Sequence, residues 1–94
     1  MPRTIEWSGR FTRDDKRERR GQHRQTLDDA PAEVLDAIAD GQPLEPRHRD
    51  HSMKGDWQDH RDCHVKPDLV LIYRLTNDDI LQLVRLGSHS ELGI

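Results

Sequence analysis

The chain has 94 residues, of which 32% are hydrophobic, 35% charged and 4% aromatic, and its formal net charge at pH 7 is −3. This length allows one small domain, 1–94, and the charge argues against a uniformly basic nucleic-acid binder. No segment approaches the roughly 20 apolar residues that cross a bilayer, and the first ten residues lack the apolar core of a signal peptide. The lone cysteine, Cys63, excludes an internal disulfide, so we expect a cytoplasmic protein with no membrane contact.

Charge is unevenly distributed along the chain. The segment 10–24 is rich in Arg and Lys, whereas 28–40 contains Asp and Glu but neither Lys nor Arg. A small protein with oppositely charged faces is therefore predicted. The six histidines add charge that depends on their surroundings, because an imidazole titrates near neutral pH.

The first forty residues predict one strand followed by two helices. Alternation of Ile5 and Trp7 with polar neighbours indicates a short strand over 4–7. Ser8 can cap a helix that reaches about residue 23, but Phe11 is the only large apolar residue in this predicted helix. We therefore expect another protein surface to supply part of its packing.

A second helix is predicted between Asp29, a suitable N-cap, and Gly41, which ends it, with Pro31 in the first turn. Its apolar face consists of Val34, Leu35 and Ile38. The loop 41–55 follows, and a loop of this length inside a small domain is often functional. It carries a group of cations and imidazoles: Arg47, His48, Arg49, His51 and Lys54.

The last third of the chain predicts three successive antiparallel strands. Polar and apolar residues alternate over 62–66, with Cys63 and Val65 facing inward. A turn at Pro67 and Asp68 leads to a buried strand, 69–75, and a second turn at 77–79 leads to its partner, 80–87. The chain is then an α+β fold of order β-α-α-β-β-β, with both helices on one face of a small antiparallel sheet.

Strand alternation also predicts a site. If Cys63 and Val65 face the core, the side chains of Asp62 and His64 project together from the opposite, open face of the sheet. Three further residues are expected to converge on that face, from the loop, the 67–68 turn and the end of the last strand: His51, Asp68 and His89.

Imidazoles beside carboxylates can perform general acid–base catalysis near neutral pH. RNA suits such a set, because its own 2′-OH attacks the adjacent phosphate once a base removes the proton, and no metal or other cofactor is required. Arg85 shares strand parity with His89 and is expected to contact the phosphate. A zinc site is the alternative for the same residue types, although the sequence has neither HxxxH nor CxxC spacing.

Three segments carry a resemblance to a known family: IEWSG near the start, DHSMKGDWQDHRDCHVKPDLVLIYRL in the second half, and RLGSHSEL near the end. They resemble the YafQ branch of the RelE/ParE superfamily of type II toxin–antitoxin toxins. The resemblance implies an mRNA interferase, an endoribonuclease that enters the 30S A site of the ribosome and cuts the messenger. It also implies a cognate antitoxin as partner, with operator DNA contacted indirectly through that antitoxin.

The resemblance implies roles for the residues already collected. His51, Asp62, His64 and Asp68 match active-site positions of the family, and His89 matches the expected proton donor to the leaving oxygen. Further cations are expected at RNA phosphates: Arg85, Lys54, Arg49 and Arg47.

Two features depart from the family pattern. Gly93 stands where the family usually has an aromatic residue that holds a base, with Ile94 next to it, and the isoelectric point is about 6.0 where family toxins are usually basic. Weakened RNA binding is therefore expected. The sequence thus leaves open a non-catalytic alternative, either a gyrase-directed toxin of the ParE type or a decayed toxin that only binds its antitoxin.

Overall fold

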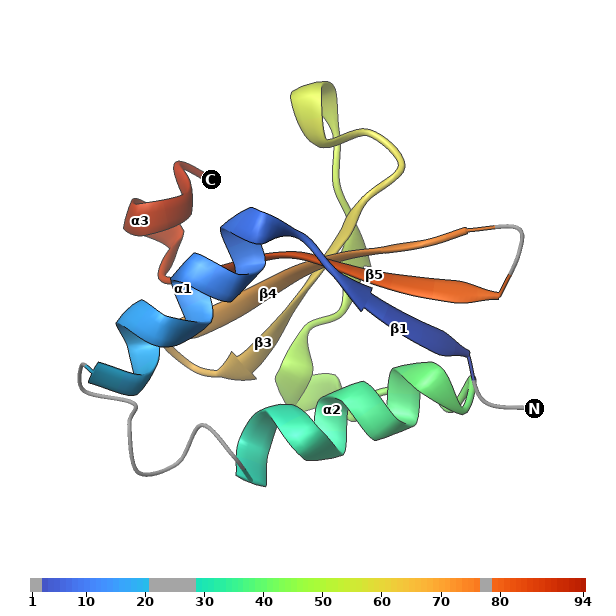
Figure 1. Ribbon diagram of the computed structural model, residues 1–94. Coiled ribbons are helices and arrows are strands. Elements are labelled where there is room, and N and C mark those ends of the chain that lie inside the picture. Colours follow the sequence, from blue (N-terminus) through green and yellow to red (C-terminus); the bar gives the residue numbers. More distant parts are fainter. Residues whose placement is uncertain (1–2, 21–28, 77–78) are drawn as a thin grey trace.

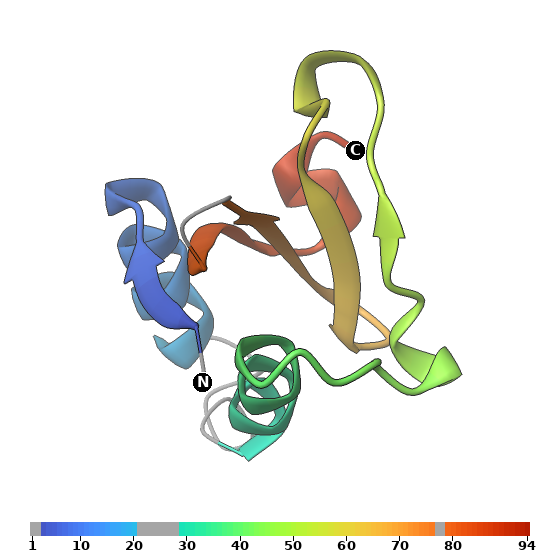
Figure 2. The same cartoon turned by 90° about the vertical axis from the view of Figure 1, so that its right-hand side faces the viewer.

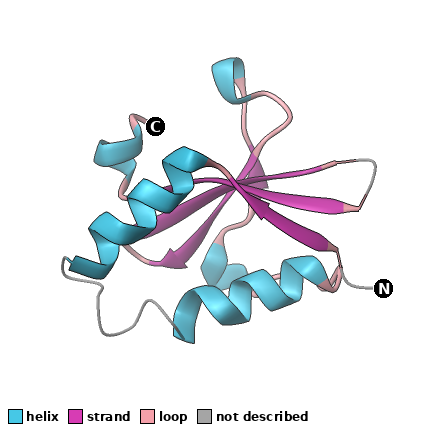
Figure 3. Cartoon of the chain, viewed as in Figure 1, coloured by secondary structure: helices cyan, strands magenta, loops and turns pink. Residues whose placement is uncertain are grey.

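The computed structural model describes residues 3–20, 29–76 and 79–94 of the chain. Five strands form one sheet in the order β1-β5-β4-β3-β2 (Figures 1 and 3). The strands are β1 (Thr4–Trp7), β2 (His51–Ser52), β3 (Arg61–Lys66), β4 (Leu69–Leu75) and β5 (Ile80–Gly87). The predicted α+β class is confirmed, and the strands predicted over 4–7, 69–75 and 80–87 have the bounds expected for them.

Three helices accompany the sheet: α1 (Gly9–Arg20), α2 (Asp29–Ala39) and α3 (His89–Leu92), together with short 3-10 turns at Pro46–His48 and Gly55–Trp57. Ser8 caps α1 as predicted, since its hydroxyl accepts a hydrogen bond from the Phe11 amide at 2.9 Å. The predicted extension of α1 beyond Arg20 and the first two residues of the predicted 77–79 turn lie outside the described residues. No helix in the described ranges is long and apolar enough to span a membrane.

The sheet is mostly antiparallel, but its first strand is parallel to its neighbour. β1 pairs with β5 in parallel register, and the remaining neighbouring strands pair antiparallel. The fully antiparallel sheet predicted from sequence is therefore wrong at this edge. Between β1 and β5 the chain passes through α1, α2 and the other three strands, and this long connection allows the two strands to run parallel.

The main core lies between the sheet and the two N-terminal helices. α2 contributes Val34 and Ile38, both buried, and Phe11 of α1 packs at the edge of the same cluster. The strands contribute alternate residues, including Cys63, Val65, Leu81 and Leu83. Placement of α1 and α2 against one face of the sheet is as predicted.

The sequence analysis predicts that the opposite face of the sheet is open, but in the structure part of it is covered. A second apolar cluster covers part of it, formed by Val70 and Ile72 of β4, Leu92 of α3, and the flanking Met53, Trp57 and Val84. α3 lies on this side, across the sheet from α2 (Figure 1; Figure 2 gives the perpendicular view). The predicted site is therefore on a partly covered face.

The helix α1 is held on β5 by polar contacts rather than by an apolar face. The carboxylate of Asp14 accepts hydrogen bonds from the Arg85 guanidinium at 2.6 and 3.2 Å and from the Leu86 amide at 3.0 Å. Asp14 is 3% exposed and Glu18 is 6% exposed. Contacts within the chain thus hold α1 through Asp14, which appeared solvent-facing in the sequence, while the expectation that another protein surface supplies part of its packing stays a prediction.

Two elements near the site were not predicted. β2 is two residues long and lies within the segment predicted as a loop, where it pairs with β3. α3 begins with a capping box, in which the Ser88 hydroxyl and the Glu91 carboxylate each accept from the other residue's amide. The Ser-x-x-Glu pattern is a known signal for a helix start and could have revealed α3.

Candidate active site

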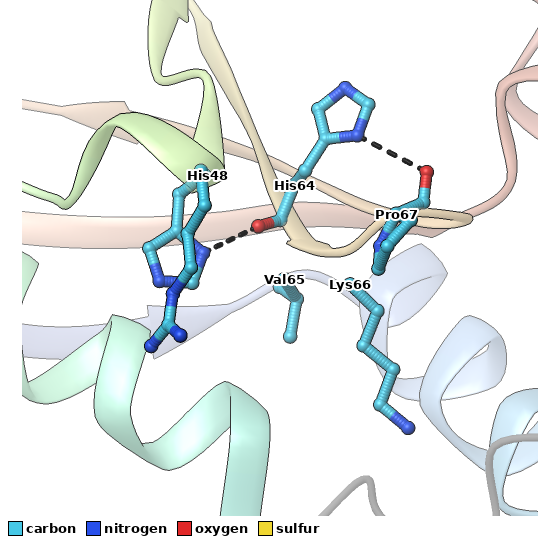
Figure 4. Close-up of a pocket in the computed structure, with 6 residues that line it drawn as sticks. His48, His64, Val65, Lys66 and Pro67 are labelled. Atoms are coloured by element: carbon cyan, nitrogen blue, oxygen red, sulfur yellow. Dashed lines mark hydrogen bonds between the residues drawn. The ribbon is translucent and has the colours of Figure 1, made fainter.

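The predicted alternation of β3 is present in the structure. His64 and Val65 project to opposite sides of the strand, as Figure 4 shows. Pairing of β2 with β3 places His51 directly opposite Asp62. Asp62, expected on an open surface, is 4% exposed, because β2 and the second apolar cluster flank it.

His51 and Asp62 form a close pair in which an oxygen atom faces each ring nitrogen of His51. The His51 Nε2 atom lies 3.0 Å from Asp62 Oδ1, although the angle does not give that oxygen an aligned hydrogen bond. The other ring nitrogen, Nδ1, lies 2.8 Å from the carbonyl oxygen of Arg49, which can only accept. With an oxygen facing each ring nitrogen, either the imidazole or the carboxyl must be protonated to avoid repulsion.

Burial and charge oppose each other at Asp62. Loss of solvent is the largest influence and raises the pKa of this carboxyl. The nearby imidazoles of His51, His64 and His89 act in the opposite direction without cancelling that effect on the pKa. All three predicted histidines are therefore close enough to Asp62 to influence its charge.

The imidazoles of His64 and His89 are neighbours. Their ring centroids are 5.0 Å apart, and the rings are tilted by 48°. The Nδ1 atom of His64 lies 3.3 Å from the Pro67 carbonyl oxygen, so Nδ1 must carry the hydrogen of that contact. In the neutral ring this leaves a lone pair on Nε2, the form required of a general base.

The four residues His51, Asp62, His64 and His89 form the cluster of the candidate site, and a pocket of about 390 Å³ lies beside it. Its lining includes His51, Asp62 and His89, together with Lys54 and Ile94. Lys54 is therefore the predicted phosphate-binding cation that the structure places at the cluster. Ile94 supplies an apolar wall, while Gly93 adopts φ 71° and ends α3 in the left-handed conformation that favours glycine.

Three predicted cations, Arg47, Arg49 and Arg85, do not line this pocket. Arg85 is paired with Asp14, so an RNA phosphate would have to compete with that carboxylate. Arg49 and Asp68 are both exposed, Arg49 after the first 3-10 turn and Asp68 in the turn before β4. Arg47 pairs with Glu45 at 3.2 Å on the surface. Their RNA-binding or catalytic roles stay predictions.

A second pocket, of about 240 Å³, lies along the end of β3 and is lined in part by His48, His64 and Lys66 (Figure 4). His48 was not predicted as a site residue, yet its Nδ1 donates to the carbonyl oxygen of His64 at 2.7 Å. This bond ties the 3-10 turn to β3 beside the bulge between His64 and Lys66. His48 therefore fixes the backbone from which His64 projects.

The sequence also gave no indication of the group that holds β2 in place. Asp50 accepts a hydrogen bond from the Tyr73 hydroxyl. It also accepts from two nitrogen atoms of Arg61, both at 3.3 Å. Burial, followed by the hydrogen bond to Asp50, raises the pKa of Tyr73 far above its usual range. Because Asp50 precedes His51, this group sets the strand that carries His51.

Comparison with known proteins decides the family. Residues 3–93 match the family described as "Bacterial toxin of type II toxin-antitoxin system, YafQ". The chain belongs to the YafQ toxin family. The resemblance inferred from the sequence is thereby confirmed, and so is the RelE-like fold, since solved YafQ structures superpose on this one.

Similar proteins from two bacteria show how closely the chain is matched. The mRNA interferase toxin YafQ of Escherichia coli K12 is 36% identical over 92 residues, covering 98% of this chain and 97% of that protein. A metal-bound toxin from Helicobacter pylori matches with a TM-score of 0.82 and 41% identity, covering 96% of this chain and 98% of that one. The E. coli DinJ-YafQ toxin-antitoxin complex matches with a TM-score of 0.81 and 33% identity, covering 98% of both chains.

The H. pylori toxin holds a metal, which raises the question whether side chains of this chain could bind one. Within 3–20, 29–76 and 79–94, no three side chains of His, Cys, Asp or Glu are placed to hold one ion together. Although His51 and Asp62 are in contact, they therefore do not amount to a ligand set. Among the described residues, the zinc alternative therefore lacks a set of three ligands.

Proposed function

We propose that this chain is the toxin of a type II toxin–antitoxin pair and acts as an endoribonuclease on mRNA. Membership of the YafQ family and the curated relatives named mRNA interferase support this activity. The observation that carries the mechanism is the pair of neighbouring imidazoles, His64 and His89, of which His89 lines a pocket together with Lys54. One imidazole can take a proton while the other gives one.

In the proposed reaction, the 2′-oxygen of the scissile nucleotide attacks the adjacent phosphorus. His64 accepts the 2′-OH proton at Nε2, which the Pro67 contact leaves as the acceptor nitrogen. The bond from phosphorus to the 5′-oxygen breaks, and His89 donates a proton to that oxygen. The products are a 2′,3′-cyclic phosphate and a 5′-hydroxyl, so every proton and bond is accounted for.

The remaining members of the site supply charge and orientation. His51 lies 3.0 Å from the buried Asp62 and presents positive charge near the phosphate whenever its imidazole is protonated. Lys54, which lines the same pocket, adds a second cation. Asp68 follows Pro67, whose carbonyl orients His64, and is the remaining carboxylate proposed for acid–base work.

We further propose that the reaction takes place on the ribosome and that a cognate antitoxin silences it. A relative from E. coli has been solved as a DinJ-YafQ toxin-antitoxin complex, which supports the antitoxin as partner. Operator DNA would be reached through that antitoxin. Although the net charge is −3, exposed cations gather on α1 at Arg10, Arg13, Lys16 and Arg20, and they would meet RNA phosphates.

Induction of the protein followed by mapping of cuts in translated mRNA tests this proposal. We expect His89→Ala to reduce cleavage by about 100-fold or more, the usual loss for a general acid. His60→Ala is the matched control, because His60 contacts Trp57 and the Gln58 carbonyl, away from the cluster. Equal cleavage by wild type and His89→Ala would overturn the role of His89, and growth arrest without any RNA cutting would favour a non-catalytic toxin.

A further inference from the structure

The guanidinium of Arg17 in α1 contacts both β5 and α3 at the junction between these two elements. Its Nη2 atom donates to the carbonyl oxygen of Leu86, the penultimate residue of β5, at 2.9 Å. Its Nε atom lies 3.1 Å from Oε2 of Glu91 in α3. Its Nη1 atom donates to Asp14 at 3.0 Å, which fixes the guanidinium on α1. All three nitrogens of Arg17 are thus engaged, and they join three elements.

Gly87 makes room for this contact. A Cβ atom on Gly87 would lie 2.8 Å from Nη2 of Arg17, closer than such atoms approach in proteins. The backbone of Gly87 is not in the left-handed region, so its conformation alone does not require glycine. The absent side chain instead lets the guanidinium lie directly against the β5–α3 junction.

Glu91 connects this contact to His89. One carboxylate oxygen, Oε1, accepts from the Ser88 amide and closes the capping box, while the other, Oε2, pairs with Arg17. His89 is the first residue of α3, between those two capping residues. The place of the His89 ring against His64 therefore depends on a four-residue helix whose start is fixed from α1 (Figure 1).

Arg17 is also the cation shared by two neighbouring acids. Its Nη2 atom lies 3.3 Å from the carboxylate of Glu18, which is 6% exposed and close enough to Glu91 to interact with it. Glu18 and Glu91 also share a side-chain hydrogen bond, and burial together with the neighbouring Glu91 raises the pKa of Glu18. Without the guanidinium this pair of acids loses its shared cation, and α3 loses the ion pair that holds it against α1.

We propose that Arg17 is a positioning residue for His89, acting through Glu91 and the β5–α3 junction. The inference rests on the proposed function, in which His89 protonates the leaving oxygen. A displacement of about 1 Å at a reacting group costs on the order of 100-fold in rate. Loss of Arg17 should therefore remove most of the benefit of the general acid and leave the base, His64, in place.

A pair of mRNA substrates separates this role from simple loss of structure. One carries the normal 5′-oxygen at the cut site, and the other carries sulfur there, because a thiolate leaves without needing a proton. In a translation reaction, we expect Arg17→Ala to slow cleavage of the oxygen substrate by about 10- to 100-fold. Cleavage of the sulfur substrate should stay near the wild-type rate, which also shows that the variant is folded.

Three further variants complete the experiment. Arg17→Lys keeps the charge but not the fork of donors, so it should recover only part of the oxygen-substrate rate. Arg74→Ala removes an exposed cation of β4 that belongs to neither the site nor α1, and it should leave both rates unchanged. Gly87→Ala crowds the Arg17 guanidinium at 2.8 Å and the Glu91 carboxylate at 3.3 Å without removing either charge, so it should also give a loss confined to oxygen if Arg17→Ala does not fold.

The outcomes are distinct. Equal slowing of both substrates by Gly87→Ala and by a folded Arg17→Ala, or slowing of neither, would overturn the positioning role while leaving the proposed function intact. A wild-type protein that cuts neither substrate would overturn the proposed function, and this inference with it.

Discussion

Replacing Asp14 by Ala should destabilise the fold more than any substitution on the exposed faces of the helices. The carboxylate is 5% exposed and receives four hydrogen bonds, two from Arg85, one from Arg17 and one from the Leu86 amide. These bonds outweigh the effect of burial and lower the pKa of Asp14 below its ordinary value. Phe11, which is only partly buried, is the apolar residue that α1 adds to the core.

The size of the loss follows from what the substitution leaves behind. The Arg85 side chain is 18% exposed, so its charge would stay largely out of water without a partner. Breaking a buried ion pair from one side costs about 3 to 5 kcal/mol, and the orphaned Leu86 amide adds to that. Because Arg85 retains some solvent contact, we expect about 3 kcal/mol for Asp14→Ala. A domain of this size has roughly 5 to 10 kcal/mol of stability in total.

Urea denaturation of wild type and variant measures this loss directly, and a melting temperature lower by about 10 °C or more should accompany it. Asp36→Ala is the matched control, since Asp36 is an exposed acid on α2 and its loss should cost less than about 0.5 kcal/mol. In a double-mutant cycle, Arg85→Ala should add little once Asp14 is gone. A loss for Asp14→Ala as small as that for Asp36→Ala would refute the view that polar contacts hold α1.

Two other predictions concern the site. Because burial raises the pKa of Asp62 above its ordinary value of 3.8, the folded protein loses stability as the pH rises through that raised pKa. Asp62→Asn should therefore melt above wild type by a margin that grows from pH 4 to pH 7; a margin that narrows would contradict this. Tyr73→Phe removes the hydroxyl that donates to Asp50 and should cost about 1 to 2 kcal/mol in urea denaturation, whereas unchanged stability would show that Arg61 alone holds Asp50.

The sequence predicted the C-terminal strands well because periodicity decides them. Alternation over 62–66 placed Asp62 and His64 on one face, and the apolar runs over 69–75 and 80–87 matched β4 and β5. Strand alternation could not predict which side of the sheet the Arg85 side chain faces. The register shifts between Ile72 and Tyr73, where an extra residue on β5 changes which side each following residue faces.

What the sequence did not reveal depends on contacts between distant residues. Two-residue strands such as β2 are too short to show a period, and β2 is held by Asp50 through Tyr73 and Arg61. The charged face of α1 looks solvated until the structure shows Asp14 meeting Arg85, 71 positions away. Only α3 had a readable local signal, in Ser88 and Glu91.

Replacement of a single 2′-hydroxyl in the messenger tests the central claim most directly. The account requires the 2′-oxygen of the nucleotide before the cut to be the nucleophile, with His64 taking its proton. An mRNA with one 2′-deoxynucleotide at the mapped site should escape cleavage there while the other sites are cut normally, and the normal product should end in a 2′,3′-cyclic phosphate. Cleavage of the deoxy-substituted site at the normal rate would contradict the mechanism.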